Sequence, residues 1–158
     1  MSDTNRAIQT SQEGAKAQIR FDGRAILMAE DMHINAEIFQ ELLAGRGAHV
    51  VHAKDGEQAV KLFTDSEAGA FDVILMDIVM PRMDGYEATQ AIRRSAHPDA
   101  DRIPIIAMTA YDIGEDRQRS LEAGLDEHLK KPVDPQILFR TIDTFIKNGR
   151  TAREWTEG

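Results

Sequence analysis

A small set of polar residues, spread over most of the sequence, has side chains that could together bind a divalent cation and a phosphate group. The set consists of Glu30, Asp31, Asp77, Thr109 and Lys131. Carboxylate oxygens are the preferred ligands of hard cations such as Mg²⁺, which retains water ligands that a phosphate oxygen can replace. A carboxylate can also accept a phosphoryl group, and a hydroxyl and an ammonium can hold the added oxygens. These residue types therefore suit Mg²⁺-dependent phosphoryl transfer to Asp77.

Each of these residues also has an ordinary structural explanation. The three carboxylates could be surface charges at strand ends, Thr109 a strand-end residue and Lys131 a solvated charge. Two like charges about 4 Å apart repel by roughly 1 kcal/mol in water, and by about 4 kcal/mol at an effective dielectric constant of 20. A real cluster of three carboxylates therefore needs a cation, and the question becomes whether the fold brings the residues together.

Strands and helices are predicted to alternate along the chain. The apolar run that ends at Asp77 does not alternate with polar residues, which is typical of a strand buried on both faces of a parallel sheet. Strands are predicted at residues 24–29, 48–53, 72–77, 103–108 and 126–130, and a helix follows each, beginning near residues 34, 56, 85, 113 and 135. This order predicts an α/β fold with a doubly wound, five-stranded parallel sheet, flavodoxin-like, with strand order 2-1-3-4-5 and five helices.

The predicted strand order places the polar residues at one edge of the sheet. The first and third strands are neighbours, and adjacent strands lie about 4.8 Å apart, so Glu30 and Asp31 converge with Asp77. The same alternation carries Thr109 and Lys131 to that edge. The carboxyl edge of an open α/β sheet is where ligands bind, so the arrangement favours a functional site.

Composition limits the possible domain organisation and function. The 158 residues suit one domain, predicted at residues 23–149, after a polar leader or linker at 1–22 and before a short tail at 150–158. The net charge of -8 argues against direct nucleic-acid binding. The sequence has no cysteine and no long apolar stretch, so we expect a cytoplasmic protein without membrane insertion by this chain.

Five short motifs, in order, resemble the receiver domain of two-component response regulators. They are Glu30-Asp31, Met76-Asp77, Met80-Pro81 with Met83-Asp84-Gly85, Thr109-Ala110 and Lys131-Pro132. The resemblance covers about residues 23–149. The stretch Asp31-Met32-His33-Ile34-Asn35 is similar to receivers attached to hybrid histidine kinases.

The resemblance implies a role for each site residue. Asp77 is the expected phosphoacceptor, Lys131 is expected to pair with the phosphoryl group, and Thr109 to move and hydrogen-bond it. The implied Mg²⁺ ligands are Glu30, Asp31, Asp77 and the backbone carbonyl of Val79. The Lys131-Pro132 peptide bond is expected to be cis. The implied donor is a phosphohistidine of a histidine kinase or histidine phosphotransfer domain, which docks a helix against the first helix of the receiver.

The family couples its threonine to an aromatic switch residue three positions before the lysine, and here that position is His128. An imidazole is smaller and more polar than a phenol or phenyl ring, so we expect altered switching through Thr109 and His128. The alternative is a surface histidine without a switching role. His33, His49, His52 and His97 show no metal-ligand spacing and are interpreted as structural or surface residues.

Two other function classes remain as alternatives to a phosphoacceptor module. A phosphatase of the haloacid dehalogenase kind uses an acid two residues after its nucleophile, where this chain has Val79. A phosphate-independent binding domain would commonly lose an acidic or lysine position, and none is lost here. A receiver promotes its own phosphorylation and dephosphorylation without being a turnover enzyme. The sequence leaves open whether the phosphorylated protein forms a dimer. If the sequence is part of a longer chain, the expected parent is a hybrid histidine kinase.

Overall fold

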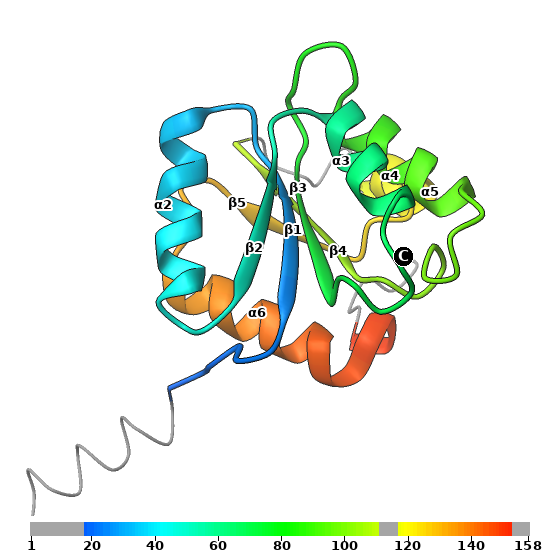
Figure 1. The fold of residues 1–158 in the computed structure, drawn as a ribbon. Coiled ribbons are helices and arrows are strands. Elements are labelled where there is room, and N and C mark those ends of the chain that lie inside the picture. The colour runs from blue at the N-terminus through cyan, green and yellow to red at the C-terminus, as the bar shows by residue number, and fades with distance from the viewer. Residues whose placement is uncertain (1–17, 111–116, 153–158) are drawn as a thin grey trace, which may run out of the picture.

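The computed structural model describes residues 18–110 and 117–152. Their strands form one parallel sheet in the order β2-β1-β3-β4-β5, which confirms the predicted topology (Figure 1). The strands are β1 (Ala25–Ala29), β2 (His49–Ala53), β3 (Val73–Asp77), β4 (Ile105–Thr109) and β5 (Glu127–Lys130). The strand β4 begins after Pro104 because proline has no N–H to donate to the ladder.

Helices cover both faces of the sheet, as the doubly wound prediction requires. On one face lie α2 (His33–Ala44) and α6 (Pro135–Asn148), and on the other lie α3 (Gly56–Thr64), α4 (Gly85–Arg94) and α5 (Arg117–Ala123) (Figure 1). The start of the helix predicted near residue 113 lies outside the described residues. None of the helices in the described part of the chain is long and apolar enough to cross a membrane.

The central strand β3 is buried along its whole length, which explains its unbroken apolar sequence. Ile74 and Met76 belong to the core on the side of α3 and α4. Val73 and Leu75 belong to the core on the side of α2 and α6. Because both cores hold β3 in place, the end of this strand is a rigid position for Asp77.

The helix α2 does not bury all of the apolar residues that recur along it at helical spacing. Phe39 and Leu43 are in the core, whereas Ile34 is 69% exposed and Ile38 is 51% exposed. In α6 the buried stripe includes Leu138, and Ile137 faces solvent instead. Helical spacing therefore identified these helices but did not separate their buried face from an exposed apolar face.

Two short segments that flank the predicted domain, residues 18–22 and 150–152, pack against it. Phe21 lies in the predicted leader, yet its ring is buried and faces the ring of Phe139, with 6.2 Å between centroids. A 3-10 helix, η1 (Gly149–Ala152), follows α6 directly and includes the first three residues of the predicted tail. Hydrophobic contacts and the ion pairs described next hold these segments.

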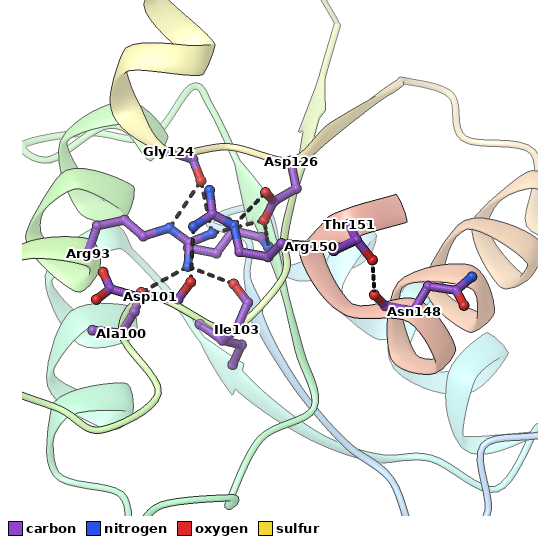
Figure 2. A network of polar contacts seen from close by, with 10 residues as sticks. Arg93, Ala100, Asp101, Ile103, Gly124, Asp126, Asn148, Arg150 and Thr151 are labelled. Carbon is purple, nitrogen blue, oxygen red and sulfur yellow. Dashed lines mark hydrogen bonds and ion pairs between the residues drawn. The ribbon is translucent and has the colours of Figure 1, made fainter. Parts of the chain in front are cut away.

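A buried network of charged groups joins α4, the start of β5 and η1 (Figure 2). The Asp126 carboxylate is fully buried and accepts hydrogen bonds from Arg93 at 2.9 Å and from Arg150 at 2.7 Å. The Arg93 guanidinium also donates to the carbonyl oxygen of Gly124. Burial lowers the pKa of Arg93 to about 10, and the Asp126 carboxylate opposes this shift. The network fixes the amino edge of the sheet, opposite the predicted site.

Candidate functional site

The three predicted acidic residues lie together at the carboxyl edge of the sheet. The register pairs Ala29 of β1 with Met76 of β3, so the residues that follow them are neighbours. One carboxylate oxygen from each of Glu30, Asp31 and Asp77 lies within 4.8 Å of the others. Glu30 and Asp77 are buried and Asp31 is exposed. This all-oxygen donor set, closed on one side and open to solvent on the other, fits a hard divalent cation.

The glycine at the start of α4 lets this helix approach Asp77. A Cβ atom at position 85 would lie 2.4 Å from the Asp77 carbonyl oxygen, so only glycine fits there. Asp84 caps the helix by accepting a hydrogen bond from the Glu87 N–H at 2.8 Å, and the Glu87 side chain completes a capping box. The Asp84-Gly85 pair therefore fixes the loop that follows β3 against the end of that strand.

Lys131 reaches the acidic cluster from the end of β5. Its Nζ lies 2.7 Å from Glu30 Oε1 and 3.3 Å from Asp77 Oδ2. The Lys131 N–H donates to the carbonyl oxygen of Thr109 at 2.8 Å, and the Lys131–Pro132 peptide bond is cis, as the resemblance implied. The ammonium thus neutralises part of the negative charge that the carboxylates bring together.

Thr109 is the last residue of β4, and its side chain is buried. The register pairs Asp77 with Met108, which places Thr109 one position beyond the end of the β3–β4 pairing. The five residues singled out in the sequence therefore all lie at the carboxyl edge, contributed by the ends of β1, β3, β4 and β5.

The cluster holds more negative than positive charge, and the pKa values reflect this. Burial and the neighbouring Glu30 carboxylate raise the pKa of Asp77 to about 7. Burial has the largest single effect on Glu30 and acts to raise its pKa, but the Lys131 ammonium and the hydrogen bonds from Asp77 and the Met32 N–H together outweigh it and lower that pKa. Without a further cation, Asp77 therefore competes with Glu30 for one ammonium and retains a proton more readily than an ordinary aspartate.

The imidazole of His128 is half-buried between β5 and α5. Its Nε2 lies 2.9 Å from the Oγ of Ser120, a fully buried residue of α5. Burial lowers the pKa of His128 to about 3, so the ring is neutral at physiological pH. The ring therefore links β5, the strand that leads to Lys131, to the helix α5.

Two polar contacts beside the site were not anticipated from the sequence. His52 Nε2 lies 2.7 Å from the carbonyl oxygen of Glu30, and Arg82 donates to the Asp55 carboxylate at 2.8 Å. The β1–β2 register, which pairs Met28 with His52, could have indicated the first contact. The second joins loops 27 positions apart and has no local signal.

An apolar surface borders the site on the side of α2. A groove of about 460 Å³ runs between this helix and residues 131–135, with Ile38, Leu42, Pro132 and Val133 among its lining residues. Val79, two residues after Asp77, is 53% exposed. The charged cluster thus opens onto a surface that can contact another macromolecule through apolar side chains.

Comparisons with known proteins agree with this geometry. The family model of the response regulator receiver domain matches residues 26–143. Hybrid signal transduction histidine kinase I of Dictyostelium discoideum is 41% identical over 123 residues, which cover 77% of this chain and 7% of that protein. Sensor histidine kinase RcsC of Salmonella typhimurium is 33% identical over 132 residues, covering 84% of this chain and 13% of that protein.

Solved structures give the same result. The receiver domain of sensor histidine kinase PA1611 from Pseudomonas aeruginosa, which has a magnesium ion coordinated in its active site cleft, superposes with a TM-score of 0.71 at 36% identity. The match covers 80% of this chain and 99% of that one. The chain thus spans nearly all of a solved receiver domain but only 7% to 13% of the length of these two curated relatives.

Proposed function

This chain belongs to the response regulator receiver domain family, and from that membership we propose that Asp77 accepts a phosphoryl group from a phosphohistidine in a two-component phosphorelay. In this reaction a bond forms between a carboxylate oxygen of Asp77 and phosphorus. The bond between phosphorus and the donor imidazole nitrogen breaks, and its electron pair stays on that nitrogen. The product then signals by a conformational change or passes the phosphoryl group onward.

The observation that carries this proposal is the convergence of one ammonium and three carboxylates at the end of β3. Lys131 lies within 3.3 Å of Asp77, close enough to pair with oxygens added there. The Thr109 hydroxyl is one strand away and is proposed to hydrogen-bond the phosphoryl group. Such transfer consists largely of positioning and charge neutralisation, and these residues supply both.

Mg²⁺ is the proposed cofactor because the donor set consists of carboxylate oxygens and remains open to solvent at Asp31. Glu30, Asp31 and Asp77 would hold the ion together with the backbone carbonyl of Val79. When bound, Mg²⁺ would neutralise phosphoryl oxygens. The residues of the chain keep their own tasks, since Asp77 supplies the nucleophile and Lys131 holds the product oxygens.

The proposed switch connects Thr109 to His128. His128 is joined to Ser120 of α5 at 2.9 Å, so a change in the position of Thr109 would act on a ring that is already linked to that helix. A phenol or phenyl ring has no ring nitrogen to form this link. We therefore expect the helix α5 to respond through the contact between His128 and Ser120.

The proposed partner is a helical histidine kinase or histidine phosphotransfer domain that docks on α2. Ile34 and Ile38 of this helix are exposed, and the groove beside it leads to Lys131. A helix with apolar side chains could bury these residues and bring its phosphohistidine to Asp77. This proposal also includes a cytoplasmic location, no binding of nucleic acid, a possible phosphorylation-dependent dimer and an origin of the chain in a hybrid histidine kinase.

Turnover of external phosphate esters is not favoured. The exposed residue two positions after Asp77 is Val79, which cannot donate a proton to a leaving group. A phosphate-independent docking role is also less consistent with the chain, since the ammonium and all three carboxylates are present and converge. Incubation with a chromogenic phosphate ester would separate the phosphatase from the phosphoacceptor.

The test of the proposed function is the intact mass of the protein after incubation with acetyl phosphate and Mg²⁺. We expect one added phosphate on the wild type, none on Asp77→Asn, and none on the wild type when EDTA is present. A wild type that stays unlabelled, under conditions that label another receiver domain, would leave the docking role as the better explanation.

A further inference from the structure

We propose that Arg82, through its ion pair with Asp55, is a positioning residue that holds the loop after β3 in the shape needed for Mg²⁺ binding. The loop comprises residues 78–84 and includes the Val79 carbonyl. The inference rests on the proposed function because it concerns the same metal site. It extends that function to two residues that are not among the proposed metal ligands and that come from separate segments of the chain.

The base of this loop is fixed by the backbone. The Gly85 N–H donates to the Ile78 carbonyl oxygen at 2.9 Å, which closes the loop next to Asp77. The Val79 N–H lies 3.3 Å from Asp77 Oδ1, and the side chain of Met80 is buried. These contacts and the Asp84 cap hold the two ends of the loop, and leave the turn at residues 81–83 to be held by other contacts.

The second half of the loop turns sharply at Arg82, which has a positive φ of 67°. The Met83 N–H donates to the Pro81 carbonyl oxygen at 2.8 Å, so the turn spans only three residues. Glycine adopts this left-handed conformation without strain, whereas a residue with a Cβ does not. The arginine therefore destabilises the backbone here, and its side chain is the part that can offset the strain.

The Arg82 side chain reaches a rigid anchor. Its Nη2 donates to Asp55 Oδ2 at 2.8 Å, and the Asp55 side chain is only 9% exposed. The other oxygen of this carboxylate accepts from the Gln58 N–H at 2.8 Å and so caps α3. Because α3 is packed in the core, Asp55 offers a fixed partner to a loop that otherwise lies at the surface.

A backbone contact brings the loop and the start of α3 together at the same place. A Cβ atom at position 56 would lie 2.6 Å from the Met83 carbonyl oxygen, so the glycine there permits the close approach. The ion pair and this contact act on consecutive residues of the loop, Arg82 and Met83. Loss of the ion pair would free the turn three residues from Val79, and the loop could then relax away from the metal site.

Positioning and simple electrostatics predict opposite results, which makes the inference testable. If Arg82 acted only through its charge, its removal would strengthen Mg²⁺ binding, and removal of the Asp55 charge would weaken it. If the pair positions the loop, removal of either partner weakens binding. The variants Arg82→Gly and Asp55→Ser suit this comparison, since glycine tolerates the positive φ and serine still caps a helix.

The experiment is a titration of the full chain with Mg²⁺, followed by amide NMR shifts, for the wild type, both single variants and the double variant. Arg82→Lys keeps the charge and can still pair with Asp55. Lys61→Gln is the control, because it removes a charge from an exposed ion pair between Lys61 of α3 and Asp65 at the end of that helix. Urea unfolding of each metal-free variant reports whether the fold is affected separately from the metal site.

We expect each single variant to raise the Kd for Mg²⁺ by about threefold to tenfold, at or below the range for groups that directly orient metal ligands. The double variant should bind no more weakly than the weaker single variant, Arg82→Lys should stay within about twofold of the wild type, and Lys61→Gln should not differ from it. Metal-free Arg82→Gly should be no less stable than the wild type, because it loses the strained arginine.

Unchanged or tighter Mg²⁺ binding by Arg82→Gly would overturn the inference. If that variant did not fold, Asp55→Ser would decide, with unchanged binding again overturning the inference. A wild type whose amides near Asp77 do not shift with Mg²⁺ would instead contradict the proposed function, so the two failures are distinguishable.

Discussion

Lys131 Nζ lies 2.7 Å from Glu30 Oε1, which joins the end of β5 to the end of β1 across two intervening strands. The distance to the proposed phosphoacceptor, Asp77, is longer at 3.3 Å. The ammonium therefore serves a structural purpose in the metal-free protein, because it neutralises carboxylates that would otherwise repel one another.

Replacement of Lys131 by methionine should destabilise the metal-free protein. The buried carboxylates lose their cation, and such a loss typically lowers the free energy of unfolding by about 3–5 kcal/mol. Urea unfolding in EDTA measures this difference. In Mg²⁺ the difference should become smaller, because the ion supplies positive charge to the same carboxylates, and an equal loss in both buffers would contradict this prediction.

The Asp77→Asn variant should be more stable than the wild type in EDTA. The buried carboxylate is held close to Glu30, so its removal relieves repulsion, and a gain on the order of 1–2 kcal/mol is expected. Thermal and urea unfolding provide the measurement. Asp143→Asn, which removes a charge from α6 far from the cluster, is the control and should not give this gain.

His128 should make the stability of the protein sensitive to acid. Burial lowers its pKa from 6.5 to about 3, so the unfolded chain binds a proton that the folded protein does not in this range. The stability contributed by the neutral ring is complete above pH 6.5 and is lost as the pH falls towards about 3. The difference in unfolding free energy between the wild type and His128→Phe should therefore shift in favour of the phenylalanine variant over this range. A pH-independent difference would contradict the assignment.

Arg93 and Arg150 bind the same buried carboxylate but should differ in importance. Arg93 is nearly buried and also donates to Gly124, whereas Arg150 is more exposed. Arg93→Gln should lower the free energy of unfolding by about 3–5 kcal/mol, and Arg150→Gln by about 1 kcal/mol. Urea unfolding measures both losses. Equal losses, or a larger loss for Arg150→Gln, would show that the burial of the arginine does not determine its contribution to stability.

The sequence predicted the fold and the convergence of the site because both follow from local patterns. The apolar run before Asp77 indicated a buried strand, and the alternation of strands and helices determined which strand ends meet. Strand boundaries were less accurate. The prediction started the fourth strand at residue 103, but Pro104 precedes the ladder in the structure, and Thr109 lies within the strand rather than after it.

Contacts between distant polar side chains could not be predicted in this way. Asp126 and Arg93 are 33 positions apart and look like surface charges in the sequence, yet they form a buried ion pair. Asp55 caps α3 through a local contact with Gln58, but its second partner, Arg82, lies in another loop. Hydrophobic periodicity describes single elements, whereas such pairs depend on how the elements pack.

Both segments that flank the domain leave it at the edge opposite Asp77. The Phe21 N–H donates a hydrogen bond to the Arg46 carbonyl oxygen near the start of β1. The Arg150 guanidinium donates to the Asp101 carbonyl oxygen near the start of β4. A strand of five residues separates this edge from the site, about 16 Å of sheet. A tether that extends about 3.5 Å per residue therefore needs roughly five residues to pass the sheet before a domain attached to it can face Asp77. A shorter tether would keep an attached domain at the amino edge of the sheet, away from the open side of the site.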